Sequence, residues 1–171
     1  METFEAILKR RSIRRYKAKD ITDKEIKRLL EAAMAAPSAH NSQPWEFLVV
    51  KDKEMRSKLS KVHSYAWMCA EATFVIVVCG NKDDLSWIED CSAASENMLV
   101  AAAEMGLGGC WIAARGTKYS GKDDGQVIAD ILGIPKRLGV LCMLSFGYPD
   151  EEKAPRTQYT EDKVHWEKYK S

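Results

Sequence analysis

An unbroken apolar run near the middle of the chain, TFVIVVC at residues 73–79, constrains the fold more than any other feature. Its β-branched side chains favour a strand. Because apolar residues occupy every position instead of alternate ones, both faces of this strand must be covered by other parts of the protein. The run therefore predicts an interior strand of a buried sheet.

The sequence on either side of this run alternates between helix and strand patterns. A capping box of Thr22 and Glu25 begins one helix, and Pro37 stops it. Gly106 is a typical residue for closing another helix. Strands are predicted at 46–50, 73–79, 109–114 and 139–149, and helices at 3–11, between Thr22 and Pro37, at 88–105 and near 124–132.

The length of 171 residues is typical of a single domain and is sufficient to bury about two-thirds of the surface that the unfolded chain exposes. No repeat or interior linker divides the sequence, so we expect one domain over residues 1–171. The polar segment 150–171 has isolated aromatic residues at Tyr159, Trp166 and Tyr169. These are too few for a separate core, and we expect this C-terminal tail to pack on a partner subunit.

The charges of the chain nearly balance, because 26 Lys and Arg residues face 25 Asp and Glu residues, a formal net charge of +1. This balance gives no overall attraction to nucleic acid or to an anionic membrane, and we expect neither as a partner. No apolar run approaches the roughly twenty residues of a membrane-spanning helix. We therefore expect a cytoplasmic protein.

Neither the cysteines nor the histidines indicate a metal site or a nucleophile. The five cysteines form no C-x-x-C pair and mostly sit in apolar runs, which is typical of buried free thiols. His40, His63 and His165 are too few and too scattered for a metal cluster. We expect no bound metal and no catalytic side chain. The cysteines are Cys69, Cys79, Cys91, Cys110 and Cys142.

The densest positive charge lies in the segment KRRSIRRYKAK near the N-terminus. Arg10, Ser12 and Arg14 alternate, so an extended backbone would turn all three to one side. Because planar guanidinium groups hold phosphate oxygens at fixed angles, we interpret the segment as a phosphate cradle. The alternation turns Arg11 and Ile13 the other way, Ile13 toward the core. The alternative is a solvated helix end whose cations complement the helix dipole.

The loop PSAHNSQPW at residues 37–45 is rich in hydrogen-bonding side chains. Asn41 and Gln43 each offer a donor and an acceptor, and Ser38 and Ser42 offer hydroxyl groups. Such a set suits the edge of an aromatic heterocycle. Because proline, serine and asparagine also favour turns for local reasons, an ordinary turn is the alternative.

A second loop, GLGGCW at residues 106–111, is only superficially like a dinucleotide-binding fingerprint. Trp111 takes the position of the third glycine, and a strand follows where a helix should begin. The glycines most simply end one helix and begin a strand. The alternative is that they let the backbone approach a flat ligand.

Four motifs, R-R-S-I-R, P-S-A-H-N-S-Q-P-W-E-F, G-L-G-G-C-W and G-Y-P, follow one another between about residue 3 and residue 156. In this order and spacing the chain resembles the FMN-dependent nitroreductase family. The resemblance implies an α+β fold, with a mixed central β-sheet flanked by helices on both faces. It also implies an intertwined homodimer that binds FMN at its interface.

The resemblance further implies a set of site residues. The FMN phosphate and ribityl chain would be held by Arg10, Arg11, Ser12, Arg14 and Arg156. The flavin ring would be lined by a loop of the other subunit, with Pro37, Ser38, Ala39, Asn41 and Gln43, and by the backbone of Trp111, Ile112 and Ala113. Candidates for substrate contact are His40, Tyr65 and Trp67, beside His63, although core or surface packing is an equal alternative for the aromatic residues.

The reaction implied by the resemblance is ping-pong hydride transfer from NADH or NADPH, through flavin N5, to a nitroaromatic, a quinone or a similar small electron-poor acceptor. Such chemistry needs no side-chain nucleophile. A non-catalytic FMN-binding or flavin-sensing module is the main alternative. RNA binding through residues 9–19, with Tyr16 stacking on a base, is a weaker alternative that the balanced net charge disfavours.

Overall fold

The computed structural model describes residues 2–119 and 121–169 of the chain. Within these residues one open sheet has the strand order β1-β2-β4-β3. All four predicted strands are confirmed, with small shifts at their ends, and β2 is an interior strand as expected. The strands are β1 (Trp45–Val50), β2 (Phe74–Asn81), β3 (Gly108–Ala113) and β4 (Leu138–Gly147).

The pairing of the strands differs in one respect from the mixed sheet that the resemblance implies. Each neighbouring pair of strands is antiparallel, because β4 lies between β2 and β3 and runs opposite to both. In the described part of the chain, parallel pairing is limited to an isolated bridge between Ser12 and Gly109. The α+β class, with helices on both faces, is confirmed.

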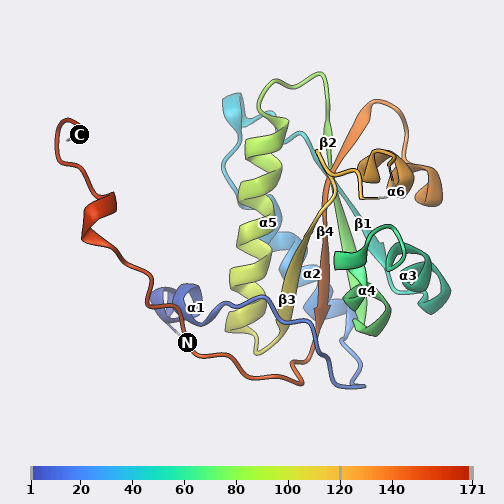
Figure 1. Ribbon diagram of the computed structural model, residues 1–171, viewed down its shortest axis with the longest axis horizontal. Helices are drawn as coiled ribbons and strands as arrows, with labels where there is room; N and C mark the ends of the chain where they lie inside the picture. The colour runs from blue at the N-terminus through green and yellow to red at the C-terminus, as the bar shows by residue number, and fades with distance from the viewer. Residues whose placement is uncertain (1, 120, 170–171) are drawn as a thin grey trace.

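Two hydrophobic clusters lie on the two faces of the sheet (Figure 1). Phe74 and Ile76 of β2 pack under α2 and α5, whereas Val75 and Val77 face α3, α4 and α6. All four side chains are fully buried, because successive residues of a strand point to opposite faces. The helices are α1 (Thr3–Lys9), α2 (Asp23–Met34), α3 (Lys53–Leu59), α4 (Met68–Glu71), α5 (Trp87–Glu104) and α6 (Asp124–Leu132).

The caps of the helices follow local sequence signals. The hydroxyl of Thr22 accepts a hydrogen bond from the Glu25 N–H at 3.2 Å, and the Glu25 carboxylate accepts one from the Thr22 N–H at 2.7 Å. The predicted capping box is therefore confirmed. Helix α5 is followed by Gly106 at φ +73°, the left-handed backbone that glycine adopts without steric cost.

All five cysteines are buried and free, as the sequence predicted. Burial raises the pKa of the Cys69, Cys79 and Cys91 thiols to about 12. These thiols therefore stay protonated at neutral pH and serve as small apolar side chains in the core. None of the helices in the described residues combines the length and the apolar composition that crossing a bilayer requires.

The two ends of the chain are bound to each other along one edge of the fold. The N–H of Lys17 donates to the Tyr148 carbonyl at 2.8 Å, and the N–H of Arg156 donates to the Leu8 carbonyl at 2.8 Å. Beyond Arg156 the tail leaves the body of the protein (Figure 1). Trp166 in this tail is 73% exposed, and packing of the tail on a partner subunit stays a prediction.

Candidate functional site

The arginine-rich N-terminal segment lies beside the start of β3. The N–H of Ile13 donates to the Gly109 carbonyl at 2.9 Å, and the Ile13 side chain is buried, as the alternation predicted. A Cβ atom at Gly108 would lie 2.7 Å from the Cβ of Ile13. The space above this glycine is therefore filled by the protein itself, which argues against the flat-ligand interpretation of GLGGCW.

The three alternating residues of the predicted cradle have different surroundings. Arg10 is bound through its Nε to the Glu96 carboxylate of α5 at 2.9 Å, whereas Arg14 lines a pocket. Burial raises the pKa of the Cys110 thiol, and Arg14, Lys153 and the Ser12 hydroxyl around it act in the opposite direction. Arg14 and Cys110 line the same pocket, so Arg14 lies at the start of β3.

The segment after Tyr148 completes this cluster. Lys153 donates to the Ser12 carbonyl at 2.5 Å and lies 3.2 Å from the Glu151 carboxylate, which accepts a hydrogen bond from the Arg14 N–H at 2.5 Å. We call Ser12, Arg14, Glu151 and Lys153 the clasp. Lys153 and Glu151 were not predicted as site residues from the sequence. Lys153 lies three residues before the predicted Arg156, in K-A-P-R, and this second cation could have indicated it.

Arg11 and Arg156 lie beside the clasp, in the same two segments of the chain. The guanidinium group of Arg11 donates to the Ala154 carbonyl. Its Nε is buried and has no hydrogen-bond partner among the described residues. Arg156, partly buried, is held by its backbone bond to Leu8. Because a buried donor without a partner is costly, the Arg11 Nε is a position where a ligand oxygen would be favourable.

A pocket of about 130 Å³ continues from Arg14 along β3. Six of the predicted site residues meet in its wall. The remainder of the wall comes from Cys110, from Met68 of α4 and from two further aromatic side chains. The six predicted residues are Arg14, Tyr65, Trp67, Trp111, Ile112 and Ala113, and the two further aromatic residues are His63 and Tyr119.

His63 fixes the far end of this pocket. Its Nδ1 accepts a hydrogen bond from the Tyr65 N–H at 3.2 Å, so the proton of the neutral ring is on Nε2. Nε2 then donates to the Ala113 carbonyl at 3.0 Å. The side chain is only 7% exposed, and it ties the end of β3 to the segment that carries Tyr65.

The loop at residues 37–45 does not reach this pocket within the same chain. The N–H of Ala39 donates to the Asp90 carboxylate of α5 at 3.2 Å, and Gln43 bonds to Ser38 and Asn41 inside the loop at 3.0 Å. In Figure 1 the loop between α2 and β1 lies at the opposite end of α5 from the N-terminal segment. Pro37, Ser38, Ala39, His40, Asn41 and Gln43 are therefore separated from the other predicted site residues.

The backbone of this loop is strained. His40, Asn41 and Gln43 have φ values of 53°, 54° and 49°, in the left-handed region that residues other than glycine seldom adopt. Strained backbone of this kind is often associated with a binding role. The hydrogen bonds inside the loop also fit an ordinary turn. The geometry of the loop is therefore consistent both with a ligand-lining segment and with an ordinary turn.

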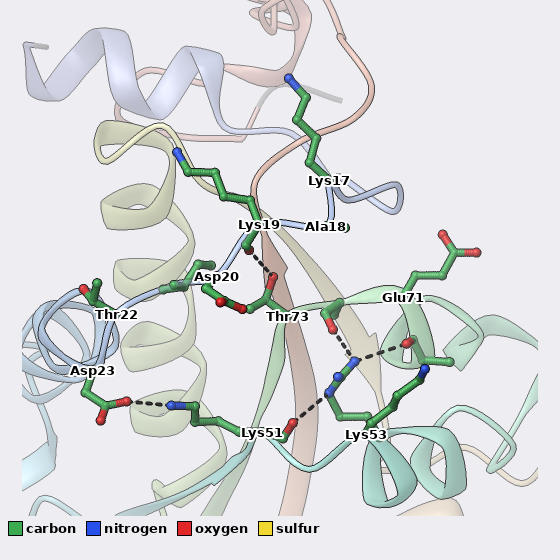
Figure 2. A pocket seen from close by; sticks show the side chains of 14 residues that line it. Lys17, Ala18, Lys19, Asp20, Thr22, Asp23, Lys51, Lys53, Glu71 and Thr73 are labelled. Atoms are coloured by element: carbon green, nitrogen blue, oxygen red, sulfur yellow. Dashed lines mark hydrogen bonds and ion pairs between the residues drawn. The ribbon is translucent and has the colours of Figure 1, made fainter.

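A larger hollow of about 870 Å³ lies between the start of α2, α3 and α4 (Figure 2). Two of its cations, Arg56 and Lys51, are already bound by the protein. The guanidinium group of Arg56 donates to the carbonyls of Ala70 and Ala72, and Lys51 is paired with Asp23 at 2.7 Å. We therefore assign no ligand to this hollow.

The contacts of residues 9–19 weaken the RNA-binding alternative. The partly buried hydroxyl of Tyr16 donates to the Ile13 carbonyl at 2.6 Å and the ring packs against Gly147, so it is not free to stack on a base. Arg15 is paired with Glu71 at 3.1 Å and lies 4.8 Å from the centre of the Trp67 ring. Over residues 2–119 and 121–169, no three His, Cys, Asp or Glu side chains gather in a way that suits a metal ion.

The fold and the site together define an α+β protein with a clasp of charged side chains beside a strand-lined pocket. The chain belongs to the nitroreductase family, whose sequence model matches residues 7–77 and 65–148. A protein of Archaeoglobus fulgidus, provisionally named an NADH dehydrogenase/NAD(P)H nitroreductase, is 38% identical over 98% of this chain and 99% of its own length.

Two solved structures have the same fold. An FMN-dependent nitroreductase from Clostridium difficile R20291 is 34% identical, with a TM-score of 0.93 over 97% of this chain and 99% of that chain. The NADPH:FMN oxidoreductase of Vibrio harveyi, solved in complex with NAD⁺, is 28% identical, with a TM-score of 0.83 over 99% of this chain and 78% of that chain.

Proposed function

We propose that the protein is a homodimeric, FMN-dependent oxidoreductase that transfers electrons from NADH or NADPH to a small electron-poor acceptor such as a nitroaromatic or a quinone. Membership of the nitroreductase family supports the class of reaction. The observation that carries the proposal for this chain is the set of contacts that joins Arg14, Glu151, Lys153 and Ser12 beside the β3 pocket.

The clasp has the donors that a flavin phosphate requires. Arg14 and Lys153 supply positive charge, and the buried Arg11 Nε is a donor without a partner in the described residues. The Glu151 carboxylate already accepts hydrogen bonds from the Arg14 N–H and from Lys153. The guanidinium group of Arg14 lines the pocket and has no hydrogen-bond or ion-pair partner in the described residues, so it can bind a phosphate oxygen, and the residues present fit the group.

The size of the pocket supports a site completed by a second copy of the chain. Its 130 Å³ is well below the roughly 300 Å³ at which pockets begin to enclose a drug-sized ligand. The pocket of a single chain would therefore leave part of a flavin ring uncovered. The loop at residues 37–45 is separated from the pocket of its own chain, and it is a suitable wall for the pocket of a partner.

An uncovered apolar surface supports the same dimer. Phe4 and Ile7 of α1 are 72% and 47% exposed, and Ile7 lines a groove of about 620 Å³ between α1, α2 and α5. Burial of such a surface favours association. We propose that a second copy covers it and that the tail beyond Arg156 packs on this partner.

The proposed roles of the residues follow from these positions. Bound FMN would supply the hydride-transfer chemistry that links the nicotinamide to the acceptor. Arg14 and Lys153 would neutralise the phosphate and Ser12 would orient it. His63 would hold the β3 backbone at Ala113 in place, and Trp67 would exclude water from the ring.

Absorption spectra of the purified protein test this function. The chain is incubated with FMN, freed of unbound flavin and mixed anaerobically with NADH or with NADPH. We expect retained flavin that bleaches rapidly with at least one nicotinamide and recovers its colour with 4-nitrobenzoate. Retained flavin that bleaches with neither nicotinamide would favour the non-catalytic binding module, and no retained flavin would reject both.

A further inference from the structure

Two tyrosine rings stand exposed at the mouth of the β3 pocket. Tyr65 is 63% exposed and Tyr119 is 56% exposed, and both line the pocket. Their ring centres are 5.2 Å apart and the planes meet at 61°, an edge-to-face arrangement. Such a pair has favourable aromatic contacts but contributes little to the core, because more than half of each side chain faces solvent.

The buried His63 fastens this pair to the sheet. The His63 ring centre is 4.9 Å from that of Tyr119 and 6.3 Å from that of Tyr65. His63 itself is held by its two hydrogen bonds to Ala113 and Tyr65. The tyrosine rings are therefore placed by a buried group that also fixes the end of β3.

A buried carboxylate holds Tyr119 from the other side. Asp124 is completely buried and accepts a hydrogen bond from the Tyr119 N–H at 3.3 Å, while its own N–H donates to the Thr117 carbonyl at 3.0 Å. The Thr117 hydroxyl donates to the Ala114 carbonyl at 2.9 Å. These bonds tie the Tyr119 backbone to the residue that follows β3.

One oxygen of the Asp124 carboxylate is not satisfied by the surrounding core. Its Oδ1 is buried and has no hydrogen-bond partner within the described residues. A buried polar atom without a partner lowers stability, and the hydrogen bond from the Tyr119 N–H and the place in the first turn of α6 are the contacts that offset this cost. We therefore assign the buried Asp124 carboxylate the role of holding the Tyr119 backbone at the mouth of the pocket.

We propose that Tyr119, together with Tyr65, forms a stacking surface that selects planar aromatic electron acceptors, with Tyr119 as the specificity-determining residue and Asp124 as its positioning residue. This inference rests on the proposed function, because it concerns the acceptor of that same site. An electron-poor ring that enters the pocket meets two electron-rich phenol rings at its mouth. The β3 residues line the same pocket. Acceptors without a ring have nothing to stack on.

Steady-state kinetics with two acceptors test the proposal. The FMN-loaded protein and its Tyr119→Ala variant are compared with 4-nitrobenzoate, which is planar, and with ferricyanide, which has no aromatic ring. We expect the KM for 4-nitrobenzoate to rise about three- to tenfold, the range that one lost aromatic contact gives. At equal FMN content, we expect the KM for ferricyanide to rise by a smaller factor, so that the ratio of the two KM values increases.

Matched variants separate the ring from its surroundings. Tyr119→Phe keeps the ring and should restore the KM for 4-nitrobenzoate, and Lys118→Ala alters the same turn and should leave it unchanged. Calorimetric titration of 4-nitrobenzoate into the oxidised protein, without nicotinamide, should show the same weakening in Tyr119→Ala. If Tyr119→Ala misfolds, Tyr65→Ala removes the other ring of the surface and should give the same selective rise in KM.

The outcomes distinguish this inference from the function on which it rests. A wild-type protein that reduces both acceptors, with variants whose KM for 4-nitrobenzoate is unchanged, overturns the stacking surface alone. Equal losses with both acceptors also overturn it, because a structural defect does not discriminate between them. A wild-type protein that reduces neither acceptor overturns the proposed function and this inference with it.

Discussion

The backbone N–H of Arg14 donates to the carboxylate of Glu151 at 2.5 Å, although 137 residues separate them in the sequence. This bond closes the clasp, because Lys153 lies 3.2 Å from the same carboxylate and bonds to Ser12. The charged groups that we assign to the flavin phosphate are thus supplied by the two ends of one chain. Breaking the contacts of the clasp should therefore weaken flavin binding and also loosen the C-terminal tail.

Replacing the clasp cations should weaken FMN binding. Arg14→Ala and Lys153→Ala each remove a charged hydrogen-bond donor, which corresponds to about 1.5–3 kcal/mol, or roughly a 10- to 150-fold rise in Kd. Quenching of flavin fluorescence on titration with the apoprotein measures this change. Lys17→Ala is a matched control, because Lys17 is outside the β3 pocket, and an equal effect in all three variants would argue against the assignment.

Removing the Glu151 side chain should loosen the C-terminal tail. Glu151→Ala leaves the Arg14 N–H without its acceptor, and we expect a loss of about 1 kcal/mol of unfolding free energy for this partly exposed group. Urea unfolding gives the free energy, and limited proteolysis reports the tail directly. Glu152→Ala, at the exposed neighbouring position, should change neither. Identical cleavage patterns for the two variants would contradict this prediction.

The same carboxylate predicts a pH dependence of stability. Burial acts to raise the pKa of Glu151, but the hydrogen bonds from the Arg14 N–H and Lys153 outweigh it, and the pKa is lowered. A lowered folded-state pKa means that the contribution of Glu151 is fully present above the unfolded-state value of about 4.3 and is lost as the pH falls below it. Unfolding curves between pH 3 and pH 7 should therefore converge for wild type and Glu151→Gln at the acidic end, and a constant difference would count against the ionised clasp.

A methyl group at Gly108 should displace the N-terminal segment from β3. The new Cβ would lie 2.7 Å from Ile13, so either the strand or the segment must move, at about 1–3 kcal/mol of unfolding free energy. Urea unfolding of Gly108→Ala measures this loss. The double variant with Ile13→Gly removes the Cβ, Cγ1 and Cγ2 atoms that the new methyl group would meet, so it should be destabilised by less than the sum of the two single changes. Strict additivity would show that the two residues are not in contact.

The secondary structure of this protein could largely be predicted from local patterns. The β2 run, the Thr22 capping box and the left-handed Gly106 each depend on neighbouring residues, and each was predicted correctly. Helix α3 was missed, because Leu59 is its only buried residue and the apolar pattern is correspondingly weak. The antiparallel pairing was missed because strand order depends on contacts between distant segments.

The candidate site was less predictable for the same reason. The motif residues Arg14 and Trp111 were found from the sequence, but Lys153, Glu151 and Tyr119 acquire their roles only when distant segments meet. No local pattern marks Asp124 as buried. Sequence also cannot separate a loop that lines its own pocket from one that lines the pocket of a second copy, and that distinction is central to the proposed site.

Mixing two defective variants tests this shared site most directly. Arg14→Ala impairs the clasp, and Ala39→Trp adds bulk to the loop at residues 37–45, so each variant alone should retain little FMN. In a twofold-symmetric dimer, an equal mixture that is refolded together contains heterodimers with one intact site, and about one quarter of all sites should bind FMN. Flavin absorbance per chain after removal of free FMN is the measurement. Recovery to about one quarter of the wild-type value is the predicted result, and a mixture that binds no more FMN than the separate variants would contradict a site shared between two copies.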